Sequence, residues 1–318
     1  MERAFWVRSA GHGDIRPVRL PEYVRDDLLV RTLYTGVSRG TETLVFRGEV
    51  PANQYDVMRA PFQEGDFPAP VKYGYLNVGV VEQGPDDLLG RAVFCLYPHQ
   101  TRYVVPAAAV TLVPDNVPAE RAVLAGTVET AVNVAWDAAP RLGDRIAVVG
   151  AGMVGSSVAA ILARFTDVQL VDIDPEKAAV AAAIGVEFVS PDSAKGGCDL
   201  VVHASATETG LACAIGLTAP GGEVIEVSWY GDRRVNVPLG EWFHSRRLGI
   251  RASQVGTVAH PRRTYPQRMA LAMELLADPM FDALISGEFR FDELPEVMPK
   301  LASGELGGLC TRIRYERA

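Results

Sequence analysis

The sequence predicts an α/β protein of two domains, one rich in β-strands and one built on a doubly wound parallel sheet. At 318 residues the chain is long for one hydrophobic core and suits two. Eleven of the 21 prolines precede Glu120, between short runs of β-branched and aromatic residues, as expected of turns and irregular strands. From Ala119 onward apolar strands alternate with helices, which is typical of a parallel sheet covered on both faces.

The β-rich domain is expected to span residues 1–118 and to be completed by residues 256–318. We expect its strands at 28–34, 77–83, 92–96, 101–105 and 310–315, and an amphipathic helix at 265–276. The segment 47–72 carries several prolines and little periodicity, so we expect a long loop there, and long ordered loops often carry function.

The second domain is expected to span residues 119–255. It should begin with a helix at 119–138 and continue with strands at 145–149, 168–171, 187–189, 199–203 and 223–227. Helices are expected at 153–164, 175–183 and 208–217. Pro175 suits a first helical turn, and Gly185 suits the position just past a helix end.

Composition excludes several classes of function. The net charge of −8 and pI near 5.3 argue against the basic surface that binds nucleic acid. Four scattered cysteines without a CxxC pair favour a reducing, cytoplasmic setting, and the N-terminus shows no signal peptide. The uncharged run 146–163 contains three glycines and begins as a strand, so we interpret it as buried rather than membrane-spanning.

A glycine-rich motif, Gly150-Ala151-Gly152-Met153-Val154-Gly155, lies between a predicted strand and a predicted helix. In a G-x-G-x-x-G turn of this kind the first glycine permits the tight turn, and the second lets the backbone approach a pyrophosphate. The third lets helix and strand pack closely. Met153 and Val154 open the helix, whose N-terminus would face the phosphates with unpaired N–H groups.

Asp172 ends the next predicted strand, about 20 residues after the motif. A carboxylate there accepts hydrogen bonds from the adenosine ribose and repels a 2′-phosphate, so the sequence favours NAD(H) over NADP(H). A ligand-free turn is one alternative. Another is an S-adenosylmethionine methyltransferase, although such a domain usually begins near its glycine loop and rarely carries a β-rich domain before it.

Several strings resemble the medium-chain dehydrogenase/reductase family, in which a GroES-like catalytic domain accompanies a Rossmann domain. They cover most of the chain: Thr35-Gly36-Val37-Ser38-Arg39-Gly40-Thr41-Glu42, and residues 72–81, 125–131, 201–205 and 227–231. The first string is similar to that of the bacteriochlorophyllide dehydrogenase branch. The resemblance implies a nicotinamide-dependent oxidoreductase.

The chain departs from the family where its zinc enzymes bind metal. The positions of the Cys, His-Glu and later Cys or acidic ligands read Ser38, Tyr75 with Leu76, and about Gly126, and the cysteine-rich structural zinc lobe is missing. We therefore expect no zinc, with a hydroxyl or imidazole as proton donor. The catalytic candidates that the resemblance implies are Tyr75, Thr41, Ser38, Glu42 and His99, although each could have only a structural role.

The resemblance also implies further cofactor-binding residues. Arg39 would contact the pyrophosphate, and Thr130, Ser205 and Trp229 would lie near the nicotinamide. Lys177, five residues after Asp172, would reach the adenosine ribose, although a solvated helix lysine is an equally ordinary interpretation. His203 ends a strand nearby, where packing is the simpler interpretation.

The function expected is hydride transfer between NAD(H) and a small organic alcohol or carbonyl substrate. The alternatives are reduction of an activated C=C bond, of the quinone or enone type, and a dinucleotide-binding redox sensor without turnover. Aromatic residues in the expected pocket favour a bulky or planar substrate. Relatives often dimerise through the edge of the cofactor-domain sheet, so a homodimer through the strand near 250–253 is possible.

Overall fold

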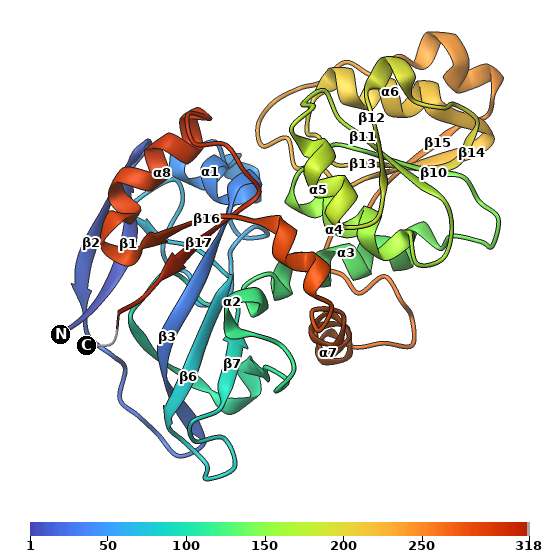
Figure 1. Ribbon diagram of the computed structural model, residues 1–318. Coiled ribbons are helices and arrows are strands. Elements are labelled where there is room, and N and C mark those ends of the chain that lie inside the picture. The colour runs from blue at the N-terminus through green and yellow to red at the C-terminus, as the bar shows by residue number, and fades with distance from the viewer. Residues whose placement is uncertain (317–318) are drawn as a thin grey trace. The chain divides into compact units, whose positions relative to one another are not determined.

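The structure, a computed structural model, describes residues 1–316 and divides into two compact units (Figure 1). Unit 1 comprises Met1–Gly126, Met273–Ala277 and Ile285–Ala318, and unit 2 comprises Thr127–Ala272 and Asp278–Leu284. The expected fold class is confirmed. The first boundary between the units lies after Gly126, whereas the sequence analysis placed it after residue 118. Residues 256–318 were expected to complete the first domain, but residues 256–272 and 278–284 belong to unit 2.

Unit 1 contains two sheets. The smaller has the order β2-β1-β5-β4, formed by β1 (Glu2–Ser9), β2 (His12–Val18), β4 (Glu64–Gly65) and β5 (Val71–Lys72). The larger has the order β16-β17-β3-β6-β7-β9, with β8 paired to β3. Its strands are β3 (Asp27–Ser38), β6 (Asn77–Gln83), β7 (Ala92–Cys95), β8 (Arg102–Pro106), β9 (Val110–Leu112), β16 (Ile285–Arg290) and β17 (Cys310–Arg314).

The C-terminal strand β17 lies inside the larger sheet. It runs antiparallel to β3, with Cys310 opposite Ser38 and Ile313 opposite Thr35, and parallel to β16. Alternate β3 residues such as Leu28 and Val30 are fully buried, because the period of two puts every second side chain into the core. Strand β3 is paired on both sides, with β17 along one edge and β6 along the other.

Unit 1 also holds three helices, α1 (Arg39–Arg47), α2 (Ala119–Ala122) and α8 (Leu294–Ser303), and 3-10 turns at Ala52–Gln54, Ala107–Ala109 and Phe291–Glu293. The sequence analysis did not predict α1. Its end is set by Gly48, which has a φ of 73° and donates its N–H to Val45 O. Glu42 in the first turn and Arg47 in the last suit the helix dipole.

Unit 2 is built on one parallel sheet with the strand order β12-β11-β10-β13-β14-β15. The strands are β10 (Ile146–Val149), β11 (Val168–Val171), β12 (Glu187–Val189), β13 (Cys198–His203), β14 (Thr218–Glu226) and β15 (Gly249–Ala252). In Figure 1, α4 (Met153–Leu162) and α5 (Lys177–Ala183) lie on one face and α6 (Glu208–Leu217) on the other. The order reverses between β10 and β13, and ligands of such sheets bind at the carboxyl ends of the strands beside that point.

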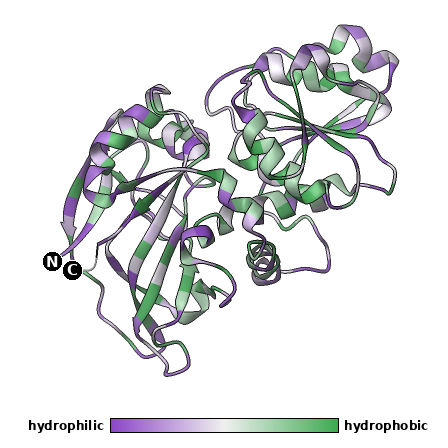
Figure 2. Cartoon of the chain, in the orientation of Figure 1, coloured by the Kyte–Doolittle hydropathy of each residue, from purple (hydrophilic) through white to green (hydrophobic). Residues whose placement is uncertain are grey.

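The remaining elements are α3 (Ala125–Ala138), α7 (Tyr265–Leu275), a π-helical turn Leu239–Phe243 and 3-10 helices Pro191–Ser193 and Pro279–Leu284. The single helix expected at 119–138 is wrong, because the chain turns between α2 and α3, where Leu124 N–H donates to Arg121 O. Helices α3 and α4 are mainly hydrophobic (Figure 2), as expected of buried helices. No helix in residues 1–316 has the length and apolar character to cross a membrane.

Candidate functional site

The glycine loop follows β10, and two of its glycines are required by close packing. Gly150 has a φ of 108°, and a Cβ on it would lie 2.6 Å from Ser205 N. A Cβ on Gly155 would lie 1.9 Å from Gly150 O. Both contacts involve backbone atoms that cannot move independently, so only glycine fits either position.

Gly152 differs from Gly150 and Gly155 because a side chain at this position would have free space around it. A Cβ there would meet nothing within 4 Å, and the residue caps α4 without a side-chain hydrogen bond. The N–H groups at the start of α4, beside the buried Met153 and half-buried Val154, are therefore free of a capping side chain. An open backbone at a helix N-terminus suits a phosphate group, so the loop fits a dinucleotide.

Asp172 follows β11 and holds the glycine loop. Its Oδ2 accepts a hydrogen bond from Ala151 N–H at 2.6 Å, and its Oδ1 accepts one from Asp174 N–H at 2.9 Å. Each oxygen keeps a further lone pair that can accept from a ribose hydroxyl. Lys177 Nζ lies 3.4 Å from Asp174 Oδ2, so this lysine forms an ion pair within the same turn.

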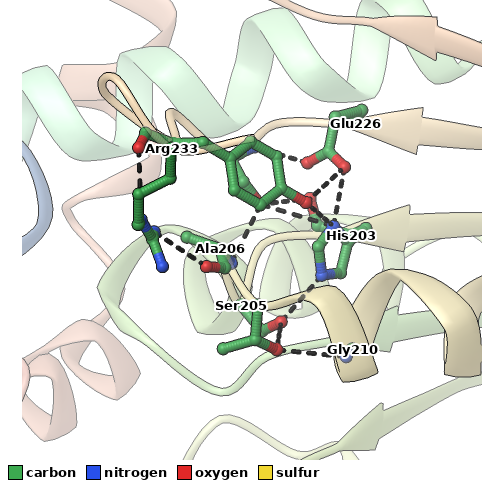
Figure 3. A network of polar contacts seen from close by, with 9 residues as sticks. His203, Ser205, Ala206, Gly210, Glu226 and Arg233 are labelled. Atoms are coloured by element: carbon green, nitrogen blue, oxygen red, sulfur yellow. Dashed lines mark hydrogen bonds and ion pairs between the residues drawn. The ribbon is translucent and has the colours of Figure 1, made fainter. Parts of the chain in front are cut away.

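A network of polar side chains joins the loops after β13 and β14 (Figure 3). His203 ends β13 and Glu226 ends β14, and His203 Nδ1 lies 2.8 Å from Glu226 Oε2. The other ring nitrogen, Nε2, lies 2.7 Å from Ser205 Oγ. The Tyr230 hydroxyl donates to Glu226 Oε2 at 3.1 Å. The fully buried imidazole thus connects both loops.

Backbone contacts extend this network. Ser228 Oγ accepts from Ala206 N–H at 3.0 Å, and Arg233 donates to Ala206 O at 3.0 Å. Burial alone would raise the pKa of Glu226, but the hydrogen bond and charge of His203, together with hydrogen bonds from Ser228, lower it overall. Burial, and then the charge of Glu226, raise the pKa of Tyr230. The cluster therefore holds an ionised carboxylate beside a neutral phenol.

The sequence analysis found part of this region. Ser205 was expected there for its cofactor role, whereas the His203–Glu226 pair was missed. The sequence signal that could have predicted this pair is that polar residues, His203 and Glu226, end two adjacent parallel strands. Trp229 is partly exposed after β14, and Thr130 lies on α3.

In unit 1, the end of β3, the start of α1 and the residues after β5 bring hydroxyl groups together. Ser38 N–H donates to Glu42 Oε1 at 2.7 Å, and Tyr75 forms hydrogen bonds with the side chains of Ser38 and Thr41. Burial, followed by the charge of Glu42, raises the pKa of Tyr75 to about 12, against the lowering effect of those hydrogen bonds. Tyr75 is thus a neutral phenol beside a buried carboxylate.

His99 lies behind this cluster. It is only 1% exposed, its Nε2 lies 2.8 Å from Glu42 Oε2, and its Nδ1 lies 2.7 Å from Thr35 Oγ1. Because both ring nitrogens have protein partners, the imidazole can orient Glu42. Arg39 is exposed on α1, where it donates to Gly308 O at 3.4 Å.

The positions that correspond to zinc ligands do not suit a metal ion. Within residues 1–316, no group of three or more His, Cys, Asp or Glu side chains could hold one. Ser38 and Tyr75 offer weakly acidic hydroxyls, and Gly126 offers no side chain; a Cβ there would lie 2.7 Å from Leu76 Cδ2. A zinc ion therefore does not fit this donor set.

Comparison with solved structures finds dehydrogenases that match the chain along its length. They include a protein from Sinorhizobium meliloti assigned as a zinc-binding dehydrogenase and bound to NADP (18% identity, TM-score 0.79, 99% of each chain covered). Two further matches are 2R,3R-butanediol dehydrogenase from Bacillus subtilis (16%, 0.77, 99% of each) and L-idonate 5-dehydrogenase from Escherichia coli (13%, 0.80, 98% of each).

No protein-family model and no curated protein sequence matches the chain. At these identities the structural likeness establishes the fold. The chain has the two-domain fold of the medium-chain alcohol and polyol dehydrogenases, a GroES-like domain with a Rossmann domain.

Proposed function

We propose that this protein is an NAD(H)-dependent, zinc-independent oxidoreductase that interconverts an alcohol and a carbonyl in a small organic substrate. The observation that carries the proposal is the glycine loop, in which Gly152 leaves room for a phosphate while Asp172 is fixed at the end of β11. The fold of known dehydrogenases supports it.

Unit 2 would hold the nucleotide through the loop Gly150–Gly155, Asp172 and the segment that bears Ser205. The proposed roles of Lys177, Thr130, Trp229 and, from unit 1, Arg39 remain expectations. Asp172 favours NAD(H), because its charge repels a 2′-phosphate. The bound nicotinamide supplies the hydride.

Unit 1 would supply the proton. Tyr75 donates from its hydroxyl to the substrate oxygen in the direction of reduction, and its raised pKa keeps the phenol protonated at neutral pH. Ser38 and Thr41 hold the phenol oxygen by hydrogen bonds, while Glu42 anchors Ser38 and is itself oriented by His99. The donor set at Ser38 and Tyr75 supports a reaction without zinc.

Assembly and setting follow the same proposal. In the cofactor-domain sheet β15 is an edge strand, paired to β14 on one side, and its residue Ile250 is 37% exposed. Such an edge suits pairing with a second copy. The four cysteines are free, which supports a reducing, cytoplasmic setting.

The test is a fluorescence titration of the purified protein with NADH and NADPH, with metal analysis of the same sample. Tight binding of NADH, weak binding of NADPH and no stoichiometric zinc are expected. A screen of alcohols and carbonyls at 340 nm then follows, with enones and quinones included. Turnover of enones or quinones alone would show that the enzyme reduces an activated C=C bond instead of a carbonyl. Nucleotide binding without any turnover would indicate a redox sensor. One zinc per chain would refute the metal-free mechanism.

A further inference from the structure

The polar network of unit 2 fixes where the proton of the Ser205 hydroxyl points (Figure 3). Although burial raises it, the contacts of His203 and Ser228 lower the pKa of Glu226 overall, so this carboxylate is ionised at neutral pH and can only accept. His203 Nδ1, 2.8 Å from Glu226 Oε2, therefore carries a ring proton. A neutral imidazole has only this proton, so Nε2 presents a lone pair to Ser205 Oγ at 2.7 Å. The Ser205 hydroxyl thus donates to His203.

Thr207 occupies one of the two lone pairs of the Ser205 oxygen. Thr207 Oγ1 caps α6 by accepting from Gly210 N–H at 3.0 Å, and it lies 2.9 Å from Ser205 Oγ. Because the Ser205 proton is directed to His203, Thr207 is the donor in this second contact. A hydroxyl has one proton and two lone pairs, so Ser205 keeps one lone pair and no free proton. Ser205 can therefore accept a hydrogen bond from a ligand but cannot donate one.

Ser205 is the member of this network that lies beside the glycine loop. It follows β13, and a Cβ on Gly150 would lie 2.6 Å from its backbone nitrogen, where the order of the sheet reverses. Ser205 is partly exposed, whereas His203 is fully buried. Helix α6 leaves room for their contact, since a Cβ on Gly210 would lie 2.1 Å from Ser205 Oγ and 2.9 Å from His203 Nε2. A ligand at the glycine loop can therefore meet the hydroxyl but not the imidazole.

We propose that His203 and Glu226 hold Ser205 as a hydrogen-bond acceptor for the carboxamide N–H of the bound nicotinamide. His203 and Glu226 are positioning residues in this role, because they act on the cofactor only through Ser205. This inference rests on the nucleotide binding proposed for unit 2. It assigns a function to the buried pair, which the proposed reaction does not otherwise use.

The fixed polarity of Ser205 selects among the polar groups of a dinucleotide. A ribose hydroxyl can donate or accept, so it does not need a partner of fixed polarity. The carboxamide nitrogen can only donate, and the carbonyl oxygen at the other end of the same group can only accept. The two ends have nearly the same shape, so a freely rotating hydroxyl would bind either. A side chain that only accepts distinguishes them and holds the carboxamide in one orientation.

The tautomer of His203 can be measured on the protein without nucleotide. The chain has five histidines, and nitrogen NMR on protein isotopically labelled at histidine distinguishes protonated from unprotonated ring nitrogens. His203→Asn assigns the signals. We expect a proton on Nδ1 and none on Nε2. A proton on Nε2 would overturn the proposal, because the Ser205 hydroxyl would then be free to donate to a ligand.

The contact itself is tested by calorimetric titration with NAD⁺ and with its acetylpyridine analogue, in which a methyl group replaces the amide nitrogen. The wild type should bind NAD⁺ more tightly. Ser205→Ala should lower the ratio of the two Kd values about threefold to tenfold, the usual contribution of one hydrogen bond. His203→Asn keeps an N–H for Glu226 but has no acceptor in place of Nε2. The ratio should therefore fall as far in this variant, although Ser205 is still present.

Ser190→Ala is the matched control, since Ser190 is an exposed serine that follows β12 of the same sheet, and it should leave the ratio unchanged. A wild-type ratio in Ser205→Ala would overturn the carboxamide contact, even if both nucleotides bound more weakly. A wild-type ratio in His203→Asn would overturn the positioning role. Failure of the wild type to bind either nucleotide would instead refute the function proposed for unit 2.

Discussion

His203 and Glu226 end adjacent parallel strands, and their side chains meet, with His203 Nδ1 2.8 Å from Glu226 Oε2. The pair fixes the loops that bear Ser205 and Ser228, and a Cβ on Gly150 would contact the first of these loops. An ion pair or neutral hydrogen bond at this position therefore sets the shape of the predicted cofactor site.

Glu226→Gln should weaken this support. The pKa of Glu226 is lowered in the folded protein, so its stabilisation is present above the ordinary pKa and lost as pH falls through the folded value. The wild type should therefore lose stability below about pH 4 more steeply than the variant. Urea unfolding across the acid range measures this, with Glu208→Gln as comparison, since Glu208 is an exposed carboxyl whose pKa is also lowered, by hydrogen bonds from Asn236. Identical acid limbs in wild type and Glu226→Gln would contradict the prediction.

The second and third glycines of the loop, Gly152 and Gly155, should respond differently to alanine. Gly155→Ala places a Cβ 1.9 Å from Gly150 O and should cost about 1–3 kcal/mol of unfolding free energy through overpacking. Gly152→Ala meets no atom of the protein, so stability should hold while NADH binds about tenfold more weakly or worse, a loss of about 1.4 kcal/mol. Thermal unfolding and NADH titration separate these effects. Undiminished binding by Gly152→Ala would show that no phosphate lies there.

Asp172→Asn tests the cofactor preference. The amide cannot accept at both positions where the carboxylate now holds Ala151 and Asp174, and it removes the charge that opposes a 2′-phosphate. Hydrogen bonds to a charged group contribute about 1.5–3 kcal/mol, so NADH should bind about tenfold to a hundredfold more weakly. The ratio of the Kd values for NADPH and NADH should fall. An unchanged ratio would remove Asp172 from the discrimination.

Tyr75→Phe should remove the proposed proton donor and leave the fold intact. A general acid contributes about 10²–10⁴-fold, and kcat for reduction should fall within that range while NADH affinity stays constant. Because the pKa of Tyr75 is raised to about 12, the wild-type rate should show no loss from ionisation of this phenol near neutral pH. Tyr73→Phe is the control, since Tyr73 packs edge-on against Tyr75. Equal kcat values for the wild type and Tyr75→Phe would assign the proton to another group.

Two buried thiols predict an alkaline loss of stability. Burial raises the pKa of Cys95 to about 12, and burial followed by the charge of Glu42 raises that of Cys310 to about 12, both from 9.0. Above pH 9 the unfolded thiols lose protons that the folded ones keep, so the unfolding free energy should fall by about 1.4 kcal/mol per pH unit for each thiol. Cys95→Ala should flatten this slope in urea unfolding; equal slopes would contradict the burial effect.

The sequence predicted the elements in which the local pattern decides the structure. Strand β6 lies at the expected residues, where a run rich in β-branched valines is mostly buried. Helix α6 begins as expected because Thr207 caps it, accepting from Gly210 N–H at 3.0 Å. The glycine loop was predicted because backbone geometry restricts Gly150 and Gly155. Helix α1 was missed because its polar first turn follows a strand without a turn signal.

Long-range pairs could not be derived from the pattern. His99 and Glu42 are 57 residues apart, and only the folded sheet and α1 bring their side chains within 2.8 Å. Both were named as catalytic candidates, and the structure shows that they are bound to each other.

The place of β17 between β16 and β3 has a consequence for biosynthesis. Residues 1–126 leave the ribosome first, yet the sheet they begin lacks an interior strand until residues 310–314 have been translated. Nearly all of unit 2 is one uninterrupted stretch, Thr127–Ala272. We therefore expect the later-synthesised domain to mature before the earlier one, the reverse of the usual N-to-C order. During that interval the edge of β3 that β17 later covers would stay unpaired and exposed.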